Sequence, residues 1–72
     1  MIDELTNEHI GVWVVTLTGN LGRIKSYDNQ KKRAWVVFSY HCNKDWKNFL
    51  NYGGRVVRYK GIKFAKYIPT NI

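Results

Sequence analysis

The stretch from Gly19 to Phe38 most constrains how this chain of 72 residues can fold. It opens with a turn bracketed by Gly19 and Gly22, which allow a tight reversal that β-branched residues would resist. A short alternating segment, a polar connection and a run rich in β-branched and aromatic residues follow. This order is typical of a β-hairpin inside a small barrel.

Alternating or β-branched segments also occur before and after this hairpin. We expect five strands, at residues 9–17, 22–27, 34–40, 55–60 and 61–68. A helical turn is expected near residues 45–52, because Trp46, Phe49 and Leu50 have helical spacing and a Gly-Gly pair follows. The pattern predicts a mainly β fold, a small five-stranded SH3-like barrel with one short helical turn.

The length of the chain indicates a single domain, since a core this small could not be divided again. Residues 1–8 are predicted to form an acidic N-terminal tail, and residues 9–72 the barrel domain. Within the tail, Ile2 and Leu5 have the spacing of one helical turn that packs on the body.

One cysteine, Cys42, excludes an internal disulfide and leaves zinc without its usual four Cys and His ligands. We therefore expect no metal and no cofactor. The N-terminal residues are acidic and polar, unlike a signal peptide, and no apolar run approaches the ~20 residues that span a bilayer. These features predict an intracellular, cytoplasmic protein without a membrane partner.

The faces of the hairpin strands depend on their register. Alternation places a basic and aromatic set on one face of residues 22–27: Arg23, Lys25 and Tyr27. The set expected to face the core from residues 34–40 is Ala34, Val36, Phe38 and Tyr40. Trp35 then lies outside with the basic set, whereas a slip of one residue would bury Trp35 and Tyr27 instead.

Charge indicates the class of partner. The net charge is +7, and three of the five acids precede residue 9, so the remaining body is about +10. A field of this sign favours polyanions, and exposed rings between cations favour base stacking. The expected nucleic-acid-binding residues are Arg23, Lys25, Tyr27, Lys31, Lys32, Arg33, Trp35, Arg55 and Arg58.

No residues form a recognisable catalytic set. Asp28 and Asp45 are interpreted as a turn former and a helix cap. His41 and Cys42 are neighbours on an expected strand, so their side chains should point to opposite faces. We therefore expect no enzymatic activity.

The segment from Gly11 to Ile24, together with Val36-Val37-Phe38, resembles the KOW motif of ribosomal and transcription-elongation proteins. Residues 36–43 also resemble a Tudor-type domain. That second resemblance implies an aromatic cage for methylated Arg or Lys, at Tyr27, Phe38, Tyr40 and Asn43. A basic body would repel a basic peptide, so RNA or DNA is the preferred partner.

Two alternatives stay open. The domain could be a protein-interaction module that binds a peptide or pairs along a strand edge, including a homodimer in which residues 1–8 cover the basic face of a second copy. The cations could also be spread evenly as solvated side chains, without a common partner.

Overall fold

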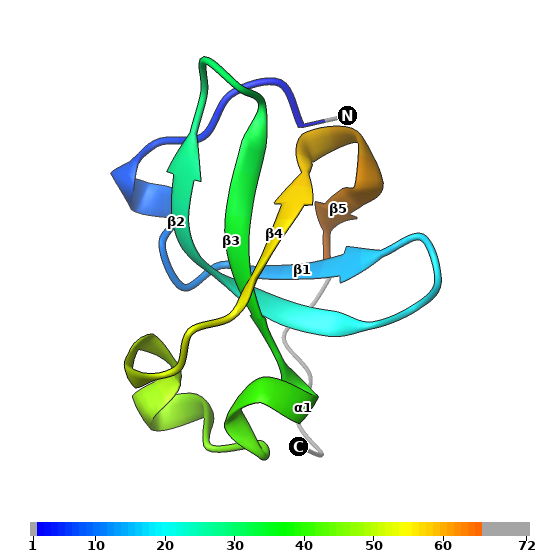
Figure 1. Cartoon of the computed structure of the whole chain (residues 1–72). Coiled ribbons are helices and arrows are strands. Elements are labelled where there is room, and N and C mark those ends of the chain that lie inside the picture. Colours follow the sequence, from blue (N-terminus) through cyan, green and yellow to red (C-terminus); the bar gives the residue numbers. More distant parts are fainter. Residues whose placement is uncertain (1, 66–72) are drawn as a thin grey trace.

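The computed structural model describes residues 2–65, which form one five-stranded antiparallel sheet (Figure 1). The strands are β1 (Trp13–Thr16), β2 (Leu21–Asp28), β3 (Arg33–Phe38), β4 (Arg55–Arg58) and β5 (Ile62–Phe64), in the order β4-β3-β2-β1-β5. One short helical segment, η1 (Asn7–His9), precedes β1, and three lie between later strands: α1 (Ser39–Cys42), η2 (Trp46–Asn51) and η3 (Tyr59–Gly61). The predicted mainly β fold is confirmed, as is the helical turn near residues 45–52.

The third strand is shorter than the sequence predicts. β3 ends at Phe38, and α1 follows where strand residues 39 and 40 were expected. The Nδ1 atom of His41 accepts a hydrogen bond from the Phe38 amide at 3.1 Å, which bends the chain into the helical turn. Tyr40 is therefore 60% exposed, and its expected place in the core is wrong. The first and fifth strands are also shorter than predicted, and residues 66–68 of the latter lie outside the described part.

The main core lies on the inner face of the sheet. Ala34, Val36 and Phe38 are all buried there, which confirms the predicted inward face of β3. Ile2 and Leu5 belong to the same cluster, with 5% and 1% of their surface exposed. The backbone between them is not helical, so the predicted helical turn is wrong, but their predicted packing on the body is correct.

A second, smaller cluster lies on the outer face of the sheet. Its buried members are Val37, Cys42, Trp46 and Phe49, and Trp13 and Tyr52 pack against it. The segment from α1 to η2 provides most of these side chains and lies at one end of the molecule (Figure 1). This segment covers one part of the outer face, and Trp35, which lies on the same face, does not belong to the cluster.

A β-bulge changes the face of the residues at the end of β2. Pairing with β3 passes from Ile24 directly to Ser26, and Lys25 has no partner. Ser26 is therefore opposite Trp35, and Tyr27 is opposite the inward-facing Ala34. The prediction that Tyr27 lies outside with the basic set is wrong, because a bulge shifts the alternation by one residue.

The two glycines of the hairpin have different roles. Gly19 has φ +90° and sits in the tight turn between β1 and β2. Gly22 lies within β2, where a Cβ atom would come within 2.5 Å of Cγ1 of Val36. Gly22 therefore permits the close approach of β2 to β3, whereas only Gly19 serves the turn.

Candidate nucleic-acid interface

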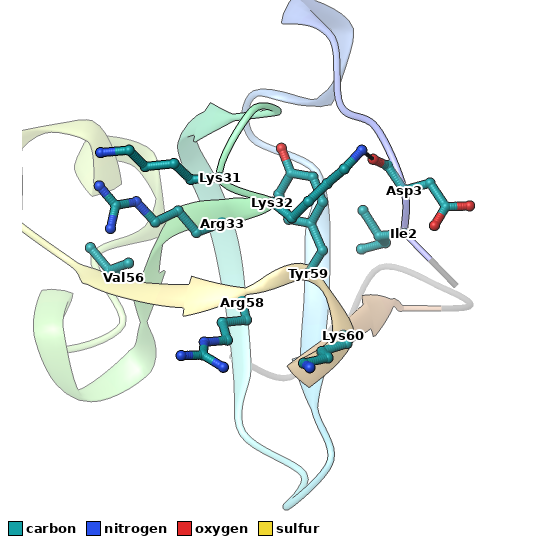
Figure 2. A pocket seen from close by; sticks show the side chains of 9 residues that line it. All are labelled: Ile2, Asp3, Lys31, Lys32, Arg33, Val56, Arg58, Tyr59 and Lys60. Carbon is teal, nitrogen blue, oxygen red and sulfur yellow. Dashed lines mark hydrogen bonds between the residues drawn. The ribbon is translucent and has the colours of Figure 1, made fainter.

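A groove of about 630 Å³ lies between the N-terminal segment, the start of β3 and the β4–η3 edge (Figure 2). Its basic lining residues are Lys31, Lys32, Arg33, Arg58 and Lys60. The other lining residues are Ile2, Asp3, Val56 and Tyr59. We call this feature the basic groove, because five of its nine lining residues are cations and only one is an acid.

The turn between β2 and β3 places the first cations of the basic groove. Oδ1 of Asp28 accepts hydrogen bonds from the amides of Gln30 and Lys31 at 3.1 and 3.3 Å, which confirms its predicted role as a turn former. Lys32 has φ +54° and completes the reversal. The Tyr59 amide donates to the carbonyl of Lys32 at 2.9 Å, so η3 is held against this turn.

The two arginines of the basic groove are paired across neighbouring strands. Arg33 on β3 is directly opposite Arg58 on β4. Like charges in this position repel each other. Lys32 donates to the backbone carbonyl of Asp3 at 2.6 Å, a contact that does not neutralise its charge. The basic groove therefore concentrates positive potential.

Arg33 also has an unsatisfied donor. Its Nε atom is buried and has no hydrogen-bond partner in the described part of the chain. The guanidinium carbon lies 5.6 Å from the ring centroid of Trp35, so the side chain bridges the groove and the outer face of β3. An anion in the groove would therefore contact the terminal guanidinium nitrogens of Arg33 and not its buried Nε.

The N-terminal segment forms one wall of the basic groove, and Asn29 holds it in place. The side-chain amide of Asn29 accepts from the Leu5 amide at 2.8 Å and donates to the Leu5 carbonyl at 2.9 Å. The Tyr59 hydroxyl donates to the same Asn29 oxygen at 2.7 Å. Burial, followed by the nearby charge of Asp28, raises the pKa of Tyr59, so the phenol stays a neutral donor.

Two predicted binding residues have structural partners instead. Nε of Arg23 donates to the Gly11 carbonyl at 2.8 Å and Nη1 donates to the Trp46 carbonyl at 3.1 Å. The guanidinium of Arg23 lies 4.9 Å from the Trp13 ring and 4.3 Å from the Phe49 ring. Burial lowers the pKa of Arg23 below its ordinary value. Arg23 therefore stabilises the second cluster and does not line the basic groove.

Lys25 resembles Arg23 in this respect, since its Nζ donates to the Tyr52 carbonyl at 2.8 Å. Tyr27 packs against the main core and donates from its hydroxyl to Oδ1 of Asn7 at 2.9 Å. Arg55 is exposed at the edge strand β4, outside the basic groove. Trp35 lies on the outer face of β3, beside the groove.

Several residues that line the basic groove were not among the binding residues predicted from the sequence. Lys60, Val56 and Tyr59 come from the expected fourth strand, where η3 replaces its last residues. Ile2 and Asp3 belong to the predicted tail. The spacing of Ile2 and Leu5 was the available signal that this segment packs on the body.

The residues named for an aromatic cage are not grouped around a common space. The rings of Phe38 and Tyr40 stack on each other, with centroids 5.7 Å apart and planes at 11°. Tyr27 is opposite Ala34, four residues along β3 from Phe38.

Asp45 lies at the N-cap of η2, but its carboxylate accepts hydrogen bonds from the side chains of Asn48 and Tyr52 and makes no capping bond.

No protein-family model, curated protein or solved structure matches this chain. The resemblances to KOW and Tudor domains therefore stay predictions. Among residues 2–65, no helix is long and apolar enough to cross a membrane. In the same part of the chain, no group of three or more His, Cys, Asp or Glu side chains could hold a metal ion.

Proposed function

We propose that this protein binds nucleic acid with low sequence specificity, and that backbone phosphates lie in the basic groove. The supporting observation is that five Lys and Arg residues line one concave surface. Each phosphate neutralised there releases condensed counterions, which favours binding. Arg33 and Arg58 add planar forks of donors that match phosphate oxygens.

Low specificity follows from the chemistry of the lining. Contacts to phosphate position a protein on its ligand but carry no sequence information. Besides the cations, the polar side chains of the basic groove are Asp3 and the already bonded hydroxyl of Tyr59. The groove therefore offers few groups that could distinguish one base from another.

Other cations provide a matched control. Lys44 and Lys47 are exposed and lie in the segment from α1 to η2, at the other end of the molecule from the basic groove (Figure 1). Removing two charges there changes the net charge as much as removing two from the groove. A comparison of the two variants separates local contacts from the overall field.

The test compares the double variant Arg58→Gln/Lys60→Gln with the control Lys44→Asn/Lys47→Gln. Fluorescence anisotropy with labelled oligonucleotides is measured over a series of salt concentrations. We expect the groove variant to bind at least about tenfold more weakly, and the slope of log K against log salt to shrink by about one for each phosphate that is no longer neutralised. The control variant should keep nearly the wild-type slope.

Two outcomes would contradict the proposal. One is that neither single-stranded nor double-stranded probes bind at low salt. The other is that both double variants lose the same affinity, which would show that the cations act only as a diffuse field.

The alternative of a protein-interaction module would use an exposed sheet edge. β4 is an outer strand of the sheet, and it carries Arg55 and Arg58. Charged side chains on an edge strand discourage pairing with another strand. We therefore prefer nucleic acid as the partner.

A further inference from the structure

Trp35 differs in its packing from the other two tryptophans. Trp46 belongs to the second cluster and Trp13 packs against it. Trp35 belongs to neither core cluster and is only partly buried. Its large ring therefore contributes less to the core than a residue of this size usually does.

Trp35 is the centre of a row that crosses three strands. Ser26 is its partner on β2 and Val56 its partner on β4. Val56 is 43% exposed, and Ser26 is also exposed. We call these three residues the Trp35 strip, in which a partly buried aromatic ring lies between an exposed hydroxyl and an exposed aliphatic side chain.

The Trp35 strip is continuous with the basic groove. Val56 belongs to both surfaces. Arg33 lines the groove, and its guanidinium lies 5.6 Å from the Trp35 ring. A ligand with a phosphate in the groove can therefore place an attached base on the strip without crossing a gap.

We propose that the ligand is a single strand, with a phosphate between Arg33 and Arg58 and the adjoining base unstacked onto Trp35 and Val56. This inference depends on the proposed function. A duplex keeps the faces of its bases stacked inside, so it could use the cations but not the Trp35 strip. A single strand can use both, as in other proteins that stack bases on aromatic side chains beside a charged groove.

The size of the basic groove also supports a single-stranded ligand. A volume of about 630 Å³ is in the range of sites that enclose small molecules, roughly 300 to 1,000 Å³. The groove is large enough for a phosphate and its sugar, while the attached base lies outside it on the Trp35 strip. The wall formed by Ile2 and Asp3 also makes the site concave, as opposed to a flat surface along which a duplex could lie.

The first experiment needs no variant. Wild-type protein is titrated with a single-stranded oligonucleotide, with the same strand lacking its bases, with a hairpin duplex of equal charge, and with inorganic polyphosphate. We expect the intact single strand to bind about 5- to 150-fold more tightly than the base-free strand, the range for one stacked base.

The second experiment identifies the stacking ring. Trp35→Leu should weaken binding of the intact strand by the same factor of about 5 to 150 and leave the affinity for the base-free strand unchanged. Trp35→Phe should lose less affinity for the intact strand than Trp35→Leu, because it keeps an aromatic ring. Thermal unfolding of each variant first establishes that it is folded.

The failures of the two proposals are distinguishable. If all four ligands bind equally and Trp35→Leu has no effect, the single-strand inference is overturned. The proposed function survives that result if Arg58→Gln/Lys60→Gln still binds weakly. If none of the ligands binds, both proposals fail.

Discussion

Arg23 and Arg33 are arginines on neighbouring strands, yet their surroundings give them different roles. Arg23 donates to two backbone carbonyls and lies between the rings of Trp13 and Phe49. Arg33 lines the basic groove, and its Nε has no partner within residues 2–65. The guanidinium of Arg23 makes its contacts within the fold, whereas that of Arg33 lies at the basic groove beside the Trp35 ring.

Replacing Arg23 by Gln should therefore affect stability and not binding. Loss of hydrogen bonds from a charged donor costs about 1.5 to 3 kcal/mol, so the free energy of unfolding in urea should fall by about that amount. Lys47→Gln, an exposed control, should change it by less than about 0.5 kcal/mol. At a temperature where the Arg23→Gln variant is folded, its affinity for an oligonucleotide should equal that of the wild type. A variant of normal stability with weak binding would show that Arg23 contacts the ligand.

At the scale of elements, the N-terminal segment is a wall and not a loose tail. Ile2 and Leu5 lie in the main core, and Asn29 binds both backbone groups of Leu5. Asp3 lines the basic groove, and Glu4 lies close enough to Tyr59 to contribute to its raised pKa. The segment therefore places negative charge beside the basic groove while it completes the fold.

Neutralising this wall without removing it should strengthen binding. We expect Asp3→Asn/Glu4→Gln to raise the affinity for an oligonucleotide by about two- to fivefold at low salt, the size of exposed charge interactions. The gain should disappear at high salt, because mobile ions screen exposed charges. Leu5→Ala is the contrasting variant, since removing a buried leucine side chain should cost about 2 to 5 kcal/mol of stability. An unchanged or lower affinity after neutralisation would contradict this role of the wall.

At the scale of the whole molecule, the distribution of charge opposes stability. Arg33 and Arg58 are paired across β3 and β4, and three lysines line the same groove. A fold selected for stability alone would not gather like charges in this way. Their convergence is consistent with a ligand that neutralises them.

Removing one of the opposed charges should therefore stabilise the free protein. We expect Arg58→Gln to raise the free energy of unfolding by about 0.2 to 1 kcal/mol at low salt, while it weakens binding. Added salt should raise the melting temperature of the wild type more than that of the variant, because salt screens a repulsion that the variant no longer has. Lys47→Gln should show neither effect. A loss of stability in Arg58→Gln would mean that the side chain is needed for packing.

Local patterns were sufficient to predict the architecture. The alternation of Ala34, Val36 and Phe38 identified the inward face of β3, and the spacing of Trp46 and Phe49 identified the helical turn. Each of these signals lies within a few residues of the chain, because side chains alternate along a strand and recur every three or four residues along a helix.

Contacts between distant segments decided the candidate site. The bulge at Lys25 turned Tyr27 inward, and the segment from α1 to η2 covered Arg23 but not Trp35. The sequence alone determined which side chains of β3 point toward the inner face of the sheet and which point toward the outer face. Only the tertiary structure determined which of the outward side chains stay exposed, because that depends on which distant segment packs over them.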